Sequence, residues 1–300
     1  MTSIQTRIPS RTLTDAAGRA QFSLRTVYQG LTGRPLPLVG TFIVVFFIVL
    51  AVVGPMIAPF RFDEIIRGAA RQSPSAVYLF GTDHLGRDVF SRVVWGAREI
   101  ITIPAITTML CVVLGTTLGM FIGYVGGWID EIVARLLDSL LAIPALVLAM
   151  VMLGTIGPSN IGIIVVIVLL YTPIVARVVR SATLNLRANG YIEAARLRGE
   201  STAYILFREI LPGVLPALAV EAALRFSYAI FLTASLGFLG LGVQPPSPDW
   251  GRMVNEARGF YAAAPWALWF PAAAIGTLII GVNLLSDGLR RVFRREGQLF

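Results

Sequence analysis

Long uncharged runs of apolar residues alternate with short charged segments along this chain of 300 residues. Arg34 and Arg61 bracket the first uncharged run, and Glu99 and Asp130 bracket the second. A membrane-spanning helix needs about 20 apolar residues to cross about 30 Å of hydrocarbon. Each run is long enough for one span, and the pattern therefore predicts an integral membrane protein.

The remaining apolar runs bring the expected number of spans to six. Residues 139–176 carry no charge but are too long for one helix, and the Gly-Pro-Ser-Asn break at 157–160 predicts two spans joined by a tight turn. A fifth run follows Pro212 and a sixth precedes Asp287. We expect an all-α membrane domain at 37–295, between a polar tail at 1–36 and a short end at 296–300. Its spans are expected at about residues 37–59, 99–127, 138–156, 161–180, 214–242 and 266–288.

The distribution of arginine predicts how these spans are oriented. With the N-terminus in the cytoplasm, the inner segments carry about twice as many arginines as the outer ones, as the positive-inside rule requires. We therefore expect both termini to be cytoplasmic. The formal net charge of +8 then reflects topology, and no nucleic-acid partner is needed to explain it. The first 36 residues lack the apolar run of a signal peptide. Their arginine- and serine-containing, acid-poor composition is also that of a transit peptide, but no amphipathic helical pattern is sustained, and we interpret them as a cytoplasmic tail.

Composition narrows the range of functions. Apolar residues make up 56% of the chain and charged residues 14%, with a mean hydropathy of +0.75, which is unlike a soluble protein. All 25 basic residues are arginine, so the chain has no lysine for a Walker A loop or a Schiff base. With a single histidine, His84, and a single cysteine, Cys111, it cannot build a zinc site or a catalytic triad alone. We expect a protein that is not an enzyme by itself and holds no cofactor.

Small residues and prolines within the spans predict close packing and bending. Glycines recur every four residues at Gly115, Gly119, Gly123 and Gly127, which places them on one helix face where another backbone can approach. Membrane helices are generally rich in glycine, but four in register favour a packing groove. Prolines that can bend a helix lie in or beside spans at Pro104, Pro144, Pro173, Pro216 and Pro271.

Glu221 and Arg225 are charged residues within the fifth expected span, with Glu221 about 7–13 Å from the start of its helix. Their i, i+4 spacing with the acid first favours a helical ion pair. An ionisable residue inside the membrane is a candidate for a functional site, so one hypothesis places the pair on a translocation path. The alternative is a structural pair whose charges neutralise each other near the inner mouth.

The loop at 181–213 is the longest expected cytoplasmic segment. Its pattern predicts a short helix, a break at Gly199 where the chain can turn without Cβ strain, and a second helix ending at a proline. A short helix with a small alanine face can insert into a groove on a partner, and a helix lying on the inner membrane surface is the alternative. The residues that carry the pattern are Glu193, Ala194, Ala195, Gly199, Ile210, Leu211 and Pro212.

This loop resembles the cytoplasmic signature of the permease subunits of ABC importers, in which Glu-Ala-Ala is followed by Gly and then by Ile-Leu-Pro. The Phe-Arg-Glu-Ile-Leu-Pro variant at 207–212 is similar to the peptide-importer branch. Three further blocks, at 81–88, 234–246 and 283–290, are similar to blocks of the C-type permease of dipeptide and oligopeptide importers. The resemblance covers about residues 37–295, with distant motifs in the right order.

The resemblance implies a type I ABC importer permease fold in the bacterial inner membrane. It also implies that ATP and Mg²⁺ are bound by two partner ATPase subunits, which a coupling helix at Glu193–Gly199 contacts. The other implied partners are a second homologous permease, an extracytoplasmic substrate-binding protein, a peptide substrate and the lipid bilayer. Two positions depart from the family pattern, since Gly213 stands where Asn is usual and Thr233 where many relatives carry Glu.

Several alternatives remain open at this point. Nickel or glutathione import uses the same scaffold, and Asp83, His84 and Asp88 are conceivable metal ligands. A Gly-Thr-Asp turn followed by a capped helix explains the same three residues, and we expect no metal there. An ion-coupled secondary transporter would need inverted repeats and ionisable groups near the midplane, and a membrane enzyme would need a nucleophile and a base.

Overall fold

The computed structural model describes residues 35–295. Of the polar tail predicted at 1–36, residues 1–34 lie outside this part of the chain, as does the short end predicted at 296–300. The described residues form helices and no strand, which confirms the all-α class. The elements are α2 (Pro35–Ile57), α3 (Val89–Val125), α4 (Gly127–Leu141), α5 (Ala145–Ile156), α6 (Asn160–Leu186), α7 (Gly190–Leu197), α8 (Thr202–Tyr204), the π-helix η2 (Ile205–Ile210), α9 (Leu211–Phe238), α10 (Trp250–Arg258) and α11 (Trp266–Arg295).

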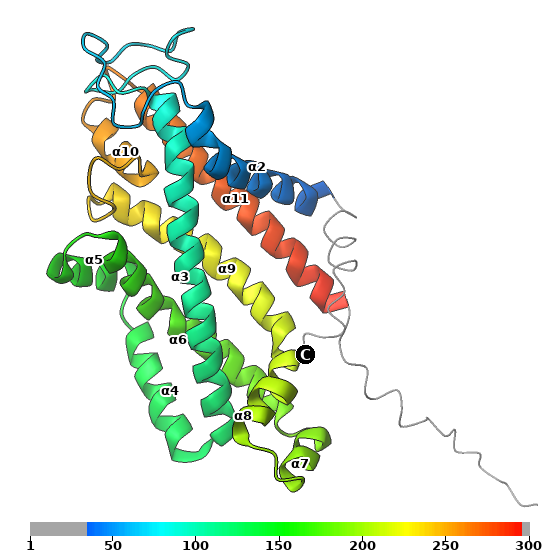
Figure 1. Ribbon diagram of the computed structural model, residues 1–300. Helices are drawn as coiled ribbons and strands as arrows, with labels where there is room; N and C mark the ends of the chain where they lie inside the picture. The colour runs from blue at the N-terminus through cyan, green and yellow to red at the C-terminus, as the bar shows by residue number, and fades with distance from the viewer. Residues whose placement is uncertain (1–34, 296–300) are drawn as a thin grey trace, which may run out of the picture.

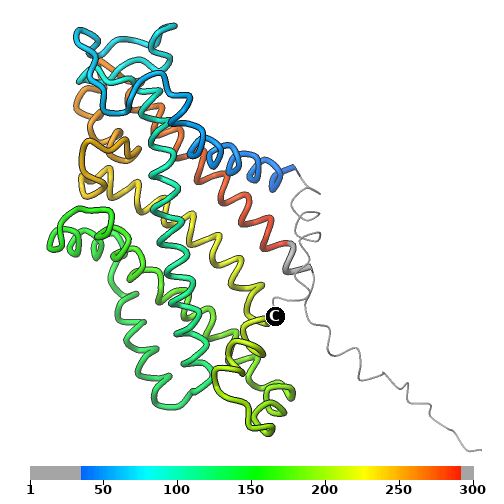
Figure 2. Tube along the Cα trace, viewed as in Figure 1, coloured from blue at the N-terminus to red at the C-terminus, as the bar shows by residue number. Residues whose placement is uncertain are grey.

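Helix α3 runs the length of the molecule (Figure 1). We name the two ends of the molecule after the short helices that lie there. Helices α7 and α8 lie at one end, which we call the α7 end. Helix α10 and the long loop before α3 lie at the other, which we call the α10 end. Helices α2 and α11 pack side by side, while α6 packs along α3 and α9 contacts both α3 and α11. The chain trace shows that α4 and α5 leave the body of the bundle on the side of α6 (Figure 2).

The described residues hold five helices that are long and apolar enough to cross a membrane, or up to six spans if a bent pair counts as one. The bent pair replaces the straight span expected at 138–156. Helix α4 ends at Leu141, α5 begins at Ala145, and the two axes differ by 85°. Pro144 precedes α5 and has no N–H to continue the hydrogen bonds of α4, so the chain turns there.

Helix α3 and the helical segment that leads into α9 also begin earlier than the apolar pattern predicts. Helix α3 begins at Val89 because the Asp88 carboxylate accepts a hydrogen bond from the Ser91 amide and caps the first turn. Its 37 residues extend about 55 Å, well beyond the hydrocarbon thickness.

The second helix of the 181–213 loop does not end at Pro212 as expected, because η2 runs directly into α9, where Pro212 occupies the first turn. Pro212 has no N–H to donate, and the wider turn of η2 lies directly before it.

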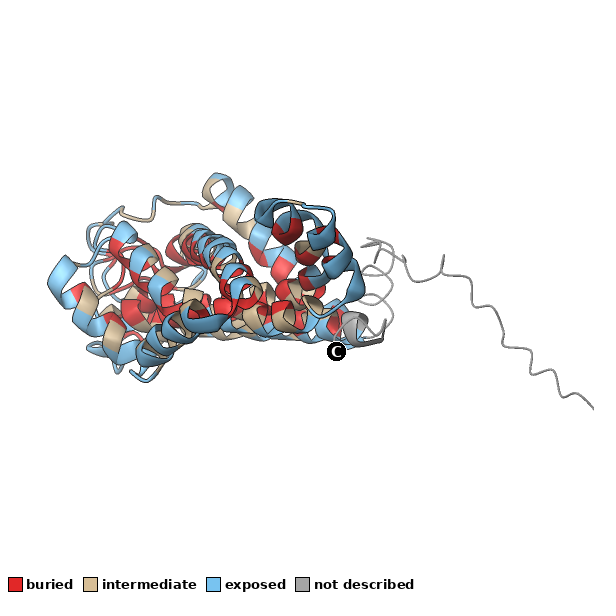
Figure 3. Ribbon diagram, turned by 90° about the horizontal axis from the view of Figure 1, so that it is seen from below, coloured by how far each residue is buried: buried red, intermediate tan, exposed pale blue. Residues whose placement is uncertain are grey.

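The buried apolar residues form two clusters, and α3 and α9 contribute to both. One cluster joins these helices to α5, α6, α7 and η2, and the other joins them to α2, α10 and α11. The outer faces of the helices are exposed (Figure 3). They carry large apolar side chains such as Phe42, Val52 and Met56, of which Met56 is 84% exposed. A soluble monomer rarely exposes so much apolar surface, and lipid is the solvent that such faces require.

Candidate functional site

Helix α7 is held in a defined orientation by the turn that follows it. Gly199 adopts a left-handed conformation with φ of 76°, which a residue with a Cβ enters only at a cost. Its amide donates to the Arg196 carbonyl at 2.9 Å, and the Glu200 amide donates to the Ala195 carbonyl at 3.2 Å. These two bonds form the Schellman motif that terminates a helix. The break expected at Gly199 lies here.

The two faces of α7 have different environments. Ile192 and Ala195 are fully buried in the apolar cluster of the bundle. Ala194 and Glu193 are exposed, and Leu197 is 85% exposed. The structure thus separates the two alanines that the sequence pattern treats as one contact face, because neighbouring residues of a helix point about 100° apart. Of the two alanines, only Ala194 is exposed to a partner. Leu197 is a second apolar side chain on the exposed face, and the motif alone does not identify it.

The Ile-Leu-Pro segment lies at the junction of η2 and α9 rather than on a free surface. Ile210 is fully buried, Leu211 is half-buried and Pro212 is exposed. The Leu211 amide donates to the Leu206 carbonyl, five residues earlier, which is the π-helical spacing. This wider turn directly precedes Pro212, which has no backbone N–H to donate. The segment therefore shapes the entry of the chain into α9.

Two arginines tie the α7 end to the last turn of α3. Arg187, which follows α6, donates from Nη1 to the Gly123 carbonyl at 3.0 Å. Arg196, within α7, donates from Nε to the Tyr124 hydroxyl at 3.1 Å. Its guanidinium carbon also lies 4.6 Å from the centroid of the Tyr124 ring. Because 72 residues separate Tyr124 from Arg196, no local pattern could have revealed this contact.

Three of the four glycines expected in register lie between α3 and α6. A Cβ added at Gly115 would lie 2.6 Å from the Val175 Cβ, and one at Gly123 would lie 3.0 Å from the Arg180 carbonyl oxygen. A Cβ at Gly119 would likewise meet the backbone of α6. Gly127 begins α4 with φ of 65°, and an added Cβ would have no neighbour within 4 Å. It serves the turn between α3 and α4 and not the packing of α3.

Glu221 and Arg225 form an ion pair within α9, with Oε1 and Nε 2.8 Å apart. Both side chains are about nine-tenths buried. The Arg225 guanidinium lies 5.4 Å from the centroid of the Tyr171 ring and 4.8 Å from that of the Tyr228 ring. The pair is thus a buried, aromatic-lined charged centre within the membrane-spanning region.

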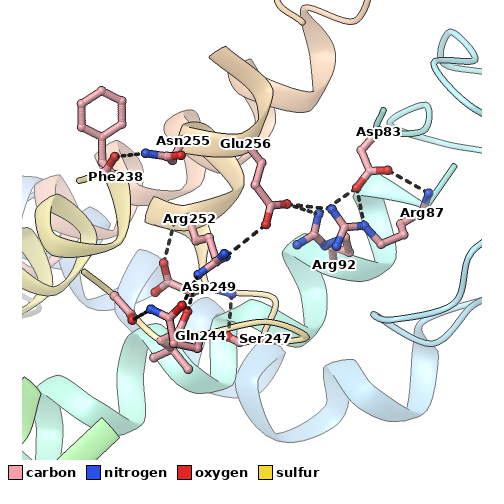
Figure 4. A network of polar contacts seen from close by, with 12 residues as sticks. Asp83, Arg87, Arg92, Phe238, Gln244, Ser247, Asp249, Arg252, Asn255 and Glu256 are labelled. Atoms are coloured by element: carbon pink, nitrogen blue, oxygen red, sulfur yellow. Dashed lines mark hydrogen bonds and ion pairs between the residues drawn. The ribbon is translucent and has the colours of Figure 1, made fainter. Parts of the chain in front are cut away.

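A second charged cluster lies at the α10 end (Figure 4). The Asp83 carboxylate accepts from Arg87 Nε at 2.6 Å and from Arg92 Nη1 at 2.8 Å. Glu256 of α10 accepts from Arg87 at 2.7 Å, from Arg92 at 3.3 Å and from Arg252 at 3.1 Å. The network joins the loop before α3, the first turn of α3 and α10. Burial alone would raise the pKa of Asp83, but the neighbouring Arg87 and Arg92 outweigh it and lower the pKa.

The same geometry accounts for the three conceivable metal ligands. Asp83 is bound by two arginines, Asp88 caps α3, and the His84 ring stacks on Phe260 with centroids 4.6 Å apart. Within residues 35–295, no group of three or more His, Cys, Asp or Glu side chains is placed to hold a metal ion. In the structure, Asp83 accepts backbone hydrogen bonds within the turn and Asp88 caps the helix that follows it.

Fold and site together define a multi-pass helical membrane protein that carries a short, half-exposed helix, α7, at one end. Residues 115–296 match the family described as the inner membrane component of binding-protein-dependent transport systems. Residues 24–74 match the N-terminal transmembrane domain of oligopeptide transport permease C. The chain belongs to the binding-protein-dependent transport family: it is a permease subunit of an ABC importer in the bacterial inner membrane.

Individual relatives support this assignment. The chain is 38% identical over 266 residues to the dipeptide transport system permease protein DppC of Alkalihalophilus pseudofirmus, an alignment that covers 89% of this chain and 88% of that protein. It is 40% identical over 231 residues to the glutathione transport system permease protein GsiD of Pectobacterium atrosepticum, covering 77% and 75%. It is 36% identical over 259 residues to DppC of Haemophilus influenzae, covering 84% and 88%. The family provides the membrane permease and not the ATPase, and it works in a complex with other subunits.

Proposed function

We propose that this subunit imports di- and oligopeptides and that α7 is the coupling helix through which it contacts an ATPase. The observation that carries the proposal is the division of α7 into two faces. Ile192 and Ala195 fix the helix in the bundle, while Leu197 stands 85% exposed beside Glu193 and Ala194. An exposed leucine on a rigid helix is costly in water and is stabilised when a partner covers it. The peptide substrate follows from the dipeptide permeases among the relatives.

The proposal includes the other subunits of the importer. Two ATPase subunits bind ATP and Mg²⁺, and their closure displaces the docked helices. A second homologous permease completes the translocation path, and an extracytoplasmic protein delivers the peptide to the α10 end. In this arrangement the α7 end and both termini are cytoplasmic, in agreement with the distribution of arginine along the chain.

We assign the Glu221–Arg225 pair to the translocation path in this proposal. A short peptide carries a charge at each terminus, and a guanidinium flanked by Tyr171 and Tyr228 is suited to a carboxylate or an aromatic side chain. The pair offers both signs of charge to a zwitterion. Binding must remain weak enough for release, and the mutual attraction of Glu221 and Arg225 limits how tightly either holds a peptide.

The experiment uses the whole importer, co-expressed and purified through a tag on the ATPase. Ala194→Arg and Glu193→Arg place a bulky cation on the exposed face of α7. We expect each to reduce the permease recovered with the ATPase by tenfold or more, since an unpaired charge at an interface costs several kcal/mol. Ala262→Arg, on an exposed alanine at the α10 end, is the matched control. Normal recovery of both α7 variants would disprove the coupling-helix assignment.

Uptake by proteoliposomes tests the cargo and the energy source. We expect labelled dipeptides to accumulate only with the binding protein outside and ATP inside. Accumulation driven by an ion gradient without ATP would instead favour a secondary transporter. Preferential uptake of glutathione or Ni²⁺ over dipeptides would replace the peptide assignment while retaining the importer.

A further inference from the structure

The last turn of α3 is one place where the segment around α7 contacts a membrane-spanning helix that is distant in the sequence. Tyr124 lies in that turn, Arg196 lies in α7, and Arg187 lies at the end of α6 just before α7. Both arginines bind the last turn of α3, one through a backbone carbonyl and one through the tyrosine. We propose that the Tyr124–Arg196 contact is the link by which a movement of α7 displaces α3. This inference rests on the coupling role proposed above for α7.

Two contacts between the same pair of side chains fix both distance and direction. The hydrogen bond from Arg196 Nε to the Tyr124 hydroxyl is 3.1 Å long, and the guanidinium lies over the ring at 4.6 Å. Arg196 is otherwise exposed, and an exposed arginine without such partners samples many rotamers. Holding it over a half-buried tyrosine therefore joins the two helices at a defined point.

Arg187 adds a second attachment point, which precedes α7 in the chain. Its guanidinium donates to the Gly123 carbonyl, which the ending helix leaves without a partner. A cation is also favourable at this position because the C-terminus of a helix carries a partial negative charge. Gly126 has a left-handed φ of 68°, and an added Cβ would lie 2.6 Å from Arg187 Nη1, so a side chain here would strain the backbone and displace the guanidinium. Helix α7 is thus held to α3 from both its preceding turn and its own last turn.

Helix α3 is built to carry a displacement rather than absorb it. It is continuous over 37 residues, and Gly115, Gly119 and Gly123 bring it into backbone contact with α6. Its first turn is held by the charged network at the α10 end, where Arg92 binds Asp83 and Glu256. A displacement at Tyr124 is therefore transmitted along a continuous helix towards the opposite end (Figure 1). Pro104 is the one proline within α3 and the point where the helix can bend.

A competing route runs through the chain itself, since α7 is followed by η2 and α9. In that case the Tyr124–Arg196 contact would merely support the local fold, and its loss would leave transport coupled to ATP hydrolysis. The two routes make different predictions for the amount of peptide moved per ATP, which is a ratio that the stability of the complex does not affect.

The experiment measures peptide uptake per ATP hydrolysed by the complete importer in proteoliposomes. Tyr124→Phe removes the hydroxyl acceptor and keeps the ring, while Tyr124→Leu and Arg196→Gln remove both contacts. We expect the Tyr124 variants, which lie outside α7, to assemble normally and to hydrolyse ATP within about twofold of wild type. Uptake per ATP should fall about fivefold or more in Tyr124→Leu and in Arg196→Gln. Arg196→Lys, which keeps a cation over the ring, should restore part of the ratio. The Tyr124→Leu/Arg196→Gln double variant should be no worse than either single variant.

Matched controls separate this result from a general effect of charge or of a lost hydroxyl. Arg135→Gln removes the same charge from an exposed ion pair on α4, and Tyr261→Phe removes a hydroxyl at the α10 end. Both should keep the wild-type ratio. Unchanged ratios in the Tyr124 and Arg196 variants, or effects that multiply in the double variant, would overturn the proposed link. A wild-type complex that shows no ATP-driven uptake would instead contradict the proposed function.

Discussion

Asp249 begins α10 with a carboxylate that is almost completely buried. Its Oδ1 accepts a hydrogen bond from the Arg252 amide at 2.7 Å and caps the helix. Burial raises the pKa of this carboxyl to about 7, with the capping bond opposing the shift and the nearby Glu99 adding to it. The charges of Arg252 and Arg92 only partly offset this effect. The residue therefore titrates near physiological pH.

We expect Asp249 to make the stability of the protein depend on pH. Its pKa is 3.8 when exposed and about 7 when folded, so the folded state binds the proton more tightly between these values. The contribution is largest below about pH 4, declines as pH rises towards 7 and is absent above it. Asp249→Asn keeps the capping oxygen and does not titrate. Tryptophan fluorescence should show the wild-type melting temperature falling relative to that of the variant between pH 4 and 7, whereas parallel curves would contradict the assignment.

Residue-scale chemistry was predictable where it depends on neighbours in the sequence. The cap at Asp88, the turn at Gly199 and the spacing of Glu221 and Arg225 all involve residues within a few positions of one another. The partners of Tyr124 and of Glu256 come from distant segments, and the sequence contains no signal that identifies them.

At the scale of the element, helix α9 follows η2 without a break and carries the Glu221–Arg225 ion pair near its middle. The i, i+4 spacing predicts the pair, and the structure adds the two tyrosine rings beside Arg225. Breaking such a buried pair leaves one charge uncompensated, while removing both charges relieves the penalty. The double variant therefore separates a role in stability from a role in transport.

We expect Arg225→Gln alone to lower the yield of assembled importer severely, because an unpaired Glu221 in a buried site costs about 3–5 kcal/mol. The Glu221→Gln/Arg225→Gln double variant should recover the yield. According to the translocation-path proposal, it should still take up peptide at less than about a tenth of the wild-type rate at equal ATPase content. Recovery of both yield and uptake would show that the pair is structural.

The bend between α4 and α5 also belongs to this scale. The apolar run predicts how many residues can enter the membrane, but it does not predict the direction of the chain after Pro144. That direction depends on packing against α6, with which both helices are in contact.

At the scale of the whole molecule, the α7 end and the α10 end lie at opposite extremes of α3 (Figure 1). The orientation proposed from arginine places the first in the cytoplasm and the second outside. The single cysteine, Cys111, is fully buried, so it interferes little with labelling at other positions.

Single cysteines introduced into a Cys111→Ala background test this orientation. Ala188→Cys lies exposed beside α7, and Ala262→Cys lies exposed at the α10 end. We expect a membrane-impermeant maleimide to label Ala262→Cys on intact cells and Ala188→Cys only in inside-out vesicles. The reverse pattern would place α7 outside the cell and would remove the basis for an ATPase contact.

The sequence by itself determined the membrane class, the approximate spans, the turn at Gly199 and the permease family. These follow from local run length, from spacing within one or two helical turns and from motifs, all of which are present in the linear chain. Tertiary structure alone decided that Ala195 faces the bundle while Ala194 and Leu197 face outward, that the third span is bent, and that Arg196 meets Tyr124. Such contacts depend on how the whole set of helices packs, because each helix face is chosen by the neighbours that cover it.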